Sequence, residues 1–106
     1  MATARTVHTI LLIQRDPNPK TRTFSDHETV AAAMQDIIET YQRRLKALHP
    51  RESNITYDIE ELYQYIDGYT ELAALVYEPN QMAYAPKDKA WIKERIHHQL
   101  SRAQRR

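Results

Sequence analysis

The sequence predicts an α+β domain in which four antiparallel strands and three amphipathic helices follow one another in the order ββααββα. Short segments rich in apolar and β-branched residues come in pairs, near residues 8–24 and 72–85. Between and after these pairs, apolar residues recur at steps of three and four, which is typical of helices with one buried face. The 106 residues fit a single domain, residues 1–106, with flexible ends at 1–7 and about 102–106.

The first strand, residues 8–14, is apolar on both of its faces. Strand side chains alternate between the two faces of a sheet, so the strand divides into two sets. One set is Thr9, Leu11 and Ile13, and the other is His8, Ile10, Leu12 and Gln14. A strand of this kind needs cover on both faces. We expect the first set to lie beneath the helices.

The second set is predicted to form a homodimer interface. Three helices can cover one face of the sheet, and no further segment is left for the other face. A two-fold dimer would cover it, because the apolar patch is complementary to itself. Ile10 and Leu12 of two subunits would contribute about 6–12 kcal/mol, at about 1.5–3 kcal/mol for each buried side chain. His8 and Gln14 would form the polar rim.

A turn at Arg15–Lys20 leads into a short second strand at Thr21–Phe24 and then into the first helix. Ser25 and Glu28 have the spacing of a capping box, which predicts the start of this helix. The helix is expected to end near His49, just before a proline. Its predicted buried face comprises Val30, Met34, Ile37, Tyr41, Leu45 and Leu48.

Two further helices carry their own start signals. Asp58 and Glu61 form a capping box, and Asp88 can cap the last helix. We expect Gly68 to end the second helix in the left-handed conformation. The predicted apolar stripe of the second helix comprises Ile59, Leu62, Ile66 and Tyr69. That of the last helix comprises Trp91, Ile92, Ile96 and Leu100.

A second hairpin is predicted from strands at Leu72–Tyr77 and Met82–Ala85, joined by a type I turn. This register places Tyr77 opposite Met82, and Pro86 is expected to end the hairpin. One face of the hairpin would carry Leu75, Tyr77, Met82 and Tyr84. The other would carry Ala74, Val76, Ala83 and Ala85.

Residues that could support chemistry are few and scattered. The chain has no cysteine and one glycine, which excludes thiolate metal sites, disulfides and glycine-rich phosphate loops. His97 and His98 are adjacent and would point about 100° apart on a helix, so they cannot form a metal-binding pair. We expect no enzymatic activity, no metal and no cofactor. No segment approaches the roughly 18 apolar residues of a membrane span, so no membrane partner is expected.

The charge of the chain argues against direct nucleic-acid binding. Fifteen basic and fourteen acidic residues give a formal net charge of +1. The basic tail, Arg102–Arg106, is interpreted as a solvated helix end that the helix dipole favours. Direct nucleic-acid binding through this arginine-rich tail is the alternative function, and deletion of the tail would discriminate the two.

Tyrosines are more numerous than the helical stripes require. Their large amphipathic side chains suit interfaces. We therefore expect a groove between the helices and the sheet that holds peptide segments of partner proteins. Its predicted residues are Tyr41, Tyr57, Tyr63 and Tyr65. The alternative is that most of these side chains complete the core.

Four segments between His8 and about Leu100 carry a family resemblance: HTILLIQ, RTFSDHETV, ITYDIEELYQYIDGYTELAALVYE and YAPKDKAWIKERI. In this order they resemble the enhancer of rudimentary homologues, which are small eukaryotic nuclear proteins. The resemblance implies a ββααββα fold and a dimer through the sheets, with Ile10 and Leu12 at the interface. It also implies an adaptor for RNA-processing and gene-expression factors, such as YTH-type RNA-binding proteins or the microRNA-processing machinery.

The resemblance further implies a nuclear location, with the cytoplasm as a second one, and links to the cell cycle and to pyrimidine synthesis. Two phosphorylation positions of the family fall on Thr23 and Thr29. Thr23 keeps an acid three residues on, as acidophilic kinases prefer, whereas Ala32 removes the acid that would follow Thr29. Ser25 also precedes an acid by three residues and is a third candidate, since phosphate is tolerated at a helix N-terminus.

Overall fold

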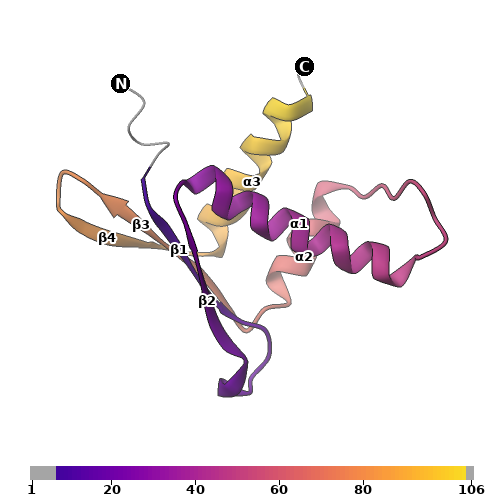
Figure 1. The fold of residues 1–106 in the computed structure, drawn as a ribbon, viewed down its shortest axis with the longest axis horizontal. Coiled ribbons are helices and arrows are strands. Elements are labelled where there is room, and N and C mark those ends of the chain that lie inside the picture. Colours follow the sequence, from indigo (N-terminus) through magenta and orange to yellow (C-terminus); the bar gives the residue numbers. More distant parts are fainter. Residues whose placement is uncertain (1–6, 105–106) are drawn as a thin grey trace.

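The computed structural model of the chain describes residues 7–104 and has the predicted α+β architecture (Figure 1). The predicted element order is confirmed, with an additional 3-10 turn after the first strand. The elements are β1 (Thr9–Gln14), η2 (Pro19–Thr21), β2 (Arg22–His27), α1 (Val30–Leu48), α2 (Ile59–Asp67), β3 (Glu71–Glu78), β4 (Ala83–Lys87) and α3 (Lys89–Gln104). The sheet has the order β2-β1-β3-β4, and its neighbouring strands are antiparallel.

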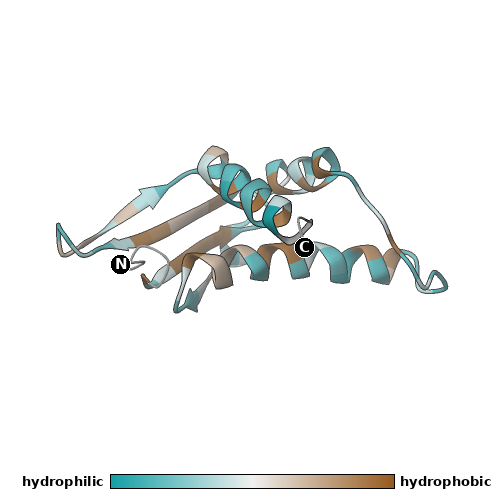
Figure 2. Cartoon of the chain, turned by 90° about the horizontal axis from the view of Figure 1, so that it is seen from above, coloured by the Kyte–Doolittle hydropathy of each residue, from teal (hydrophilic) through white to brown (hydrophobic). Residues whose placement is uncertain are grey.

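β1 lies in the interior of the sheet because it pairs with β2 on one side and with β3 on the other. Leu11 stands between Ser25 and Ala74, while Leu12 stands between Phe24 and Ala73. Residues directly opposite one another share a face, so these pairings define rows of side chains across the sheet. In Figure 2 the central strands are coloured as apolar almost without interruption.

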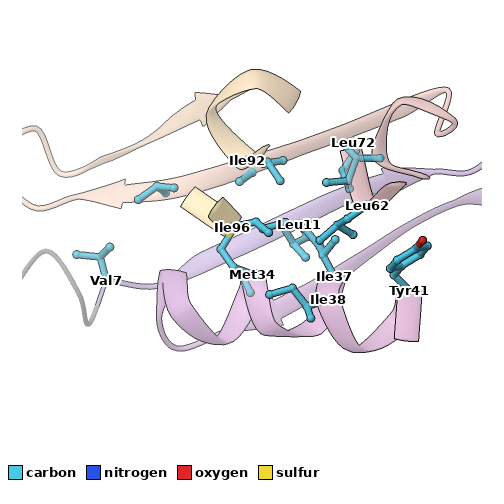
Figure 3. Close-up of a cluster of buried hydrophobic side chains, with 14 residues drawn as sticks. Val7, Leu11, Met34, Ile37, Ile38, Tyr41, Leu62, Leu72, Ile92 and Ile96 are labelled. Atoms are coloured by element: carbon cyan, nitrogen blue, oxygen red, sulfur yellow. The ribbon is translucent and has the colours of Figure 1, made fainter. Parts of the chain in front are cut away.

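The hydrophobic core lies between one face of the sheet and the helices (Figure 3). Leu11 and Thr9 are fully buried and Ile13 packs against the core, which confirms the predicted helix side of β1. The largest fully buried apolar side chains are Leu11, Met34, Ile38, Leu62, Ile66, Ile92 and Ile96. Leu48, which the helical pattern places on the buried face of α1, is instead 61% exposed. It is the last residue of α1, a helix whose far end extends past the sheet (Figure 1).

The start of α1 differs from the prediction. Ser25 is not its cap, because β2 continues to His27, which pairs with Thr9. The cap is Thr29, whose Oγ1 accepts a hydrogen bond from the amide of Ala32 at 2.9 Å. Each further residue of β2 satisfies backbone groups against β1, and this tertiary pairing outweighs the local capping signal at Ser25.

The starts of the other two helices confirm the prediction. The capping box at Asp58 is complete, with the amide of Glu61 donating to Asp58 at 3.1 Å and the amide of Asp58 donating to Glu61 at 2.9 Å. Asp88 accepts from the amide of Trp91 at 3.0 Å. Gly68 is not left-handed, since its φ is −72° and its amide continues the hydrogen bonding of the helix.

The β3–β4 hairpin has a loop of the predicted length, but the loop lies one residue later in the chain, between Glu78 and Ala83. β4 begins at Ala83, and Tyr77 stands opposite Tyr84 rather than opposite Met82. Met82 lies in the loop with a φ of 52°, the left-handed conformation that was expected at Gly68. Pro86 lies within β4 and does not end it, because β4 is an edge strand on which a missing amide proton is tolerated.

The predicted faces of the hairpin are kept, because Tyr77 pairs two residues further along the chain than predicted and strand side chains alternate with a period of two. Leu75, Tyr77 and Tyr84 share one face, and Val76 and Ala85 share the other, as predicted. Met82 belongs to neither face.

The structure describes only part of the two ends that were predicted to be flexible. Val7 is 8% exposed and belongs to the core. α3 continues through Arg102 to Gln104. Residues 1–6 and 105–106 lie outside the described part of the chain, so the prediction for them is not tested.

The cap assignment predicts the effect of a conservative substitution. Thr29→Ala leaves the amide of Ala32 without its side-chain acceptor and is expected to lower the free energy of unfolding by about 1 kcal/mol. Thr29→Ser keeps the hydroxyl and is the matched control. Urea denaturation followed by circular dichroism measures both, and equal stability of the Ala and Ser variants would contradict the assignment.

Candidate interaction surfaces

The open face of the sheet, opposite the helices, carries a band of apolar side chains. Its centre is formed by Ile10 and Leu12 of β1, which are half-buried. The register places Leu75 beside Ile10 and Phe24 beside Leu12. Phe24 is 70% exposed, which is unusual for a phenylalanine on a sheet. Because the helices pack on the other face, no helix of residues 7–104 covers this band.

A polar and aromatic row borders the band at one end. His8, just before β1, contacts Asp26 of β2 and the hydroxyl of Tyr84 in β4, the latter at 2.5 Å. The backbone of His8 also accepts a hydrogen bond from the amide of Tyr77 at 3.0 Å. The rings of Tyr77 and Tyr84 pack edge to face, with centroids 5.2 Å apart. The row therefore joins all four strands on the open face.

At the opposite end of the band, the polar side chain of Gln14 forms its hydrogen bonds within the same chain. Gln14 accepts a hydrogen bond from Nε of Arg22 at 3.0 Å and donates to the carbonyl of Asp16 at 2.9 Å. Gln14 is only 5% exposed, so it offers little surface to a second subunit. Arg22 itself is exposed at this end of the band, and the rim role of Gln14 stays a prediction.

A second surface is a cleft of about 470 Å³ between α1 and α2. Arg15, just after β1, and Tyr69, just after α2, also line it. Its lining residues are Arg15, Tyr41, Arg44, Leu45, Leu48, Glu61, Gln64, Tyr65, Gly68 and Tyr69. The volume falls within the range of about 300–1,000 Å³ that is usual for binding pockets.

Tyrosine rings form a continuous chain through this cleft. Tyr41 packs against Tyr57 and Tyr65 with centroid distances of 5.0 and 4.9 Å. Tyr65 packs edge to face on Tyr69 at 5.4 Å, and their hydroxyls are hydrogen-bonded at 2.8 Å. The guanidinium of Arg15 lies 5.9 Å from the centroid of Tyr69, within cation–π distance. The cleft thus has an aromatic wall that is fixed by its own contacts.

The structure separates the four tyrosines that were predicted to line a partner groove. Tyr41 and Tyr65 line the cleft. Tyr57 packs behind Tyr41 and accepts a hydrogen bond from Gln42 at 3.1 Å. Tyr63 lies elsewhere, with its ring 5.5 Å from the ammonium group of Lys93. The predicted groove lies between helices and sheet, whereas this cleft lies mainly between two helices.

Burial and hydrogen bonding perturb the tyrosines of the cleft. Burial raises the pKa of Tyr69 well above its ordinary value of 10.0, and the hydrogen bond to Tyr65 raises it further. The cation of Arg15 opposes this rise. Burial also raises the pKa of Tyr41, with a further contribution from the nearby carboxylate of Glu61. Both phenols are therefore neutral hydrogen-bonding groups at neutral pH.

A smaller cavity of about 290 Å³ lies beside the cleft and shares Arg15 and Tyr69 with it. It is lined by β1, β2 and α1, and includes Thr23, Asp36 and Thr40. Its walls combine core side chains with hydroxyl groups, and the carboxylate of Asp36 opposes entry of an anion.

The three candidate phosphorylation sites occupy different environments. Thr23 is exposed on β2. Thr29 caps α1 through its hydroxyl. Ser25 is half-buried, and its hydroxyl lies 2.8 Å from Nε2 of His27 and 3.5 Å from the carboxylate of Asp36. A phosphate on Ser25 would face this carboxylate, which disfavours modification of the folded chain. Modification at any of these positions stays a prediction.

Features needed for other functions can also be placed. Within residues 7–104, no group of three or more His, Cys, Asp and Glu residues could hold a metal ion. The described helices include none that is both long and apolar enough to cross a bilayer. In the basic tail, Arg102 is exposed on α3, whereas Arg105 and Arg106 lie outside the described residues.

Comparison with known proteins identifies one family. The family profile described as "Enhancer of rudimentary" matches residues 5–106. An enhancer of rudimentary homolog of Arabidopsis thaliana is 46% identical over 95 residues, covering 90% of this chain and 87% of the relative. Protein enhancer of rudimentary of Drosophila virilis is 42% identical, covering 91% and 92%. A Dictyostelium discoideum homolog is also 42% identical, covering 90% and 95%. These names describe no enzyme family.

The raised pKa of Tyr69 predicts a loss of stability in alkaline solution. The folded chain keeps the Tyr69 proton to higher pH than the unfolded chain, so the free energy of unfolding falls as pH rises above about 10. Tyr69→Phe removes this proton and is expected to flatten the decline. Tyr65→Phe removes only the hydrogen bond and should flatten it less. Urea denaturation between pH 9 and 11 measures this, and identical slopes in wild type and Tyr69→Phe would contradict the prediction.

Proposed function

The chain belongs to the enhancer of rudimentary family, and from this membership and the two surfaces we propose that it is a homodimeric adaptor for other proteins. Each subunit contributes its open sheet face to the dimer and keeps its cleft for a peptide segment of a partner. This role requires surfaces that bind other proteins, which the described residues present. It does not require a catalytic site.

The uncovered apolar band is the observation that carries the proposal. Ile10, Leu12 and Leu75 form its centre, and Phe24 extends it onto β2. Exposed contiguous apolar surface of this kind marks interaction sites on small proteins. The polar row around His8 borders the band, as a rim borders the dry centre of an interface.

A second copy of the same chain is the partner that best fits this band. A two-fold axis through the band would place Ile10 and Leu12 of both subunits in one apolar layer. Burial of these four side chains would contribute about 6–12 kcal/mol before the costs of association. This gain is comparable with the whole stability of a small domain, normally about 5–15 kcal/mol. We therefore propose that the dimer is the stable form of the chain.

Dimerisation would make the adaptor bivalent. The cleft between α1 and α2 is formed by helices and by chain segments at the ends of β1 and α2, so it is complete within one subunit. A dimer would carry two clefts at a fixed separation and could hold two segments at once. RNA-processing and gene-expression factors in the nucleus are the proposed partners, with effects on the cell cycle and on pyrimidine metabolism following through them.

The alternative, direct nucleic-acid binding through the tail, predicts a different outcome. Loss of residues 102–106 would then abolish a salt-sensitive affinity for RNA or DNA. The adaptor would keep its protein partners after the same deletion.

Charge on the two faces of β1 tests the proposed dimer. Ile10→Asp with Leu12→Asp places carboxylates in the band and is expected to yield folded monomers, because these side chains are not part of the core. Leu11→Asp buries an unpaired charge and is expected to unfold the chain. Sedimentation analysis measures the mass and circular dichroism measures the fold. A wild-type monomer, or a double variant that remains dimeric, would overturn the assignment.

The same double variant tests whether binding of partner proteins depends on the dimer. Pull-down from nuclear extract with wild type and with the folded monomer compares the proteins that each retains. Partners that need both clefts should be lost from the monomer, whereas partners of a single cleft should stay.

A further inference from the structure

The cleft between α1 and α2 is lined by apolar side chains and by two arginines that form no ion pair among the described residues. On this basis we propose that it selects peptide segments in which an acidic residue stands beside a bulky apolar residue. The inference rests on the proposed adaptor function and adds the chemistry of the segment that the cleft recognises.

The apolar part of the site lies along the last turns of α1. Leu45 packs partly against the core, while Leu48 is exposed although it belongs to the same helical face. Both leucines line the cleft opposite Tyr65. An aliphatic or aromatic side chain that enters between them would remove the exposed surface of Leu48 from water.

Two arginines stand at the cleft without a carboxylate partner. The ion pairs of the described residues involve four other cations, namely His8, His27, His49 and Lys93. Neither Arg15 nor Arg44 is among them, although both line the cleft. The position of Arg15 is favoured by its contact with the ring of Tyr69. The guanidinium groups are therefore available to a ligand.

The acidic residue of the cleft, Glu61, offsets only one of these two positive charges and forms no ion pair with either arginine among the described residues. The carboxylate of Glu61 accepts the amide hydrogen bond of Asp58 at 2.9 Å and completes the cap of α2. Arginine recognises carboxylates through paired hydrogen bonds in a planar geometry, so an aspartate or glutamate of a partner is the complementary group.

The hydroxyl pair of Tyr65 and Tyr69 adds a polar contact within the cleft. The two oxygens lie 2.8 Å apart, and one hydroxyl donates to the other. The second hydroxyl keeps its own proton for a further acceptor. A backbone carbonyl of a bound segment could accept it.

The aromatic geometry favours a peptide over single-stranded nucleic acid, which would also be attracted to arginine and tyrosine. Stacking of bases requires exposed ring faces. Tyr41 is buried and its ring packs between Tyr57 and Tyr65. Tyr65 in turn packs against Tyr69 at an interplanar angle of 90°. Each of these rings already packs against at least one other ring, which leaves less ring surface for a base to stack on.

Selection from a random 12-residue peptide library displayed on phage tests the proposal. Immobilised wild-type protein should enrich peptides with Asp or Glu next to Leu, Phe or Trp. One enriched peptide, synthesised with a fluorescent label, should bind about tenfold more weakly to the Arg15→Glu, Arg44→Glu variant, because attraction becomes repulsion at two positions. Replacement of its acidic residues by amides should weaken binding to wild type in the same direction.

Two control variants locate the site. Arg43→Glu with Arg51→Glu makes the same change of net charge at exposed residues outside the cleft, and should retain wild-type affinity. Leu48→Ser changes the exposed leucine and should weaken binding without loss of fold. Circular dichroism confirms the fold of each variant.

The outcomes separate the inference from the proposed function. The inference would be overturned if the enriched peptides lacked acidic residues, or if they bound the Arg15→Glu, Arg44→Glu variant as tightly as wild type. Either result would leave the adaptor function standing. A labelled oligouridine that binds the cleft with the same arginine dependence would overturn the inference in favour of nucleic acid. A failure to enrich any peptide would count against both.

Discussion

The two apolar faces of β1 are the constraint on which the rest of the structure depends. One face must be covered by α1, α2 and α3, and Leu11 shows this solution with complete burial. The other face has the same apolar character, but the helices of the chain are already committed to the first. A strand with this sequence in the interior of a four-stranded sheet therefore requires either a partner or an exposed apolar surface.

The fold could be predicted where the local sequence pattern is not opposed by pairing with a distant strand. The capping box at Asp58 and the apolar stripe of α2 were confirmed because periodicity and cap agree there. At Ser25 the cap pattern competes with strand pairing, and the pairing of β2 with β1 prevails. The position of the loop before Ala83 was misjudged by one residue because it is set by the pairing of Tyr77 with Tyr84, which a local turn pattern does not contain.

The two candidate surfaces differ in how far sequence could predict them. The open sheet face follows from a period of two along a single strand, so its central residues Ile10 and Leu12 could be named. The burial of Gln14 could not, since it depends on Arg22 eight residues away. The cleft joins the end of β1 to α1 and α2. Tyrosine content predicted Tyr41 and Tyr65, whereas the roles of Arg15 and Tyr69 arise only from the packing of these distant segments.

The placement of Arg15 links the two surfaces through one rigid element. β1 carries Ile10 and Leu12 on the open face, and Arg15, which follows its last residue, lines the cleft. Burial of Leu11 holds this strand against the helices, so one set of core contacts supports both surfaces. In the proposed dimer, the strands that meet at the interface would also set the separation of the two arginine-lined clefts. A partner with two acidic segments could then be selected by their spacing as well as by their composition.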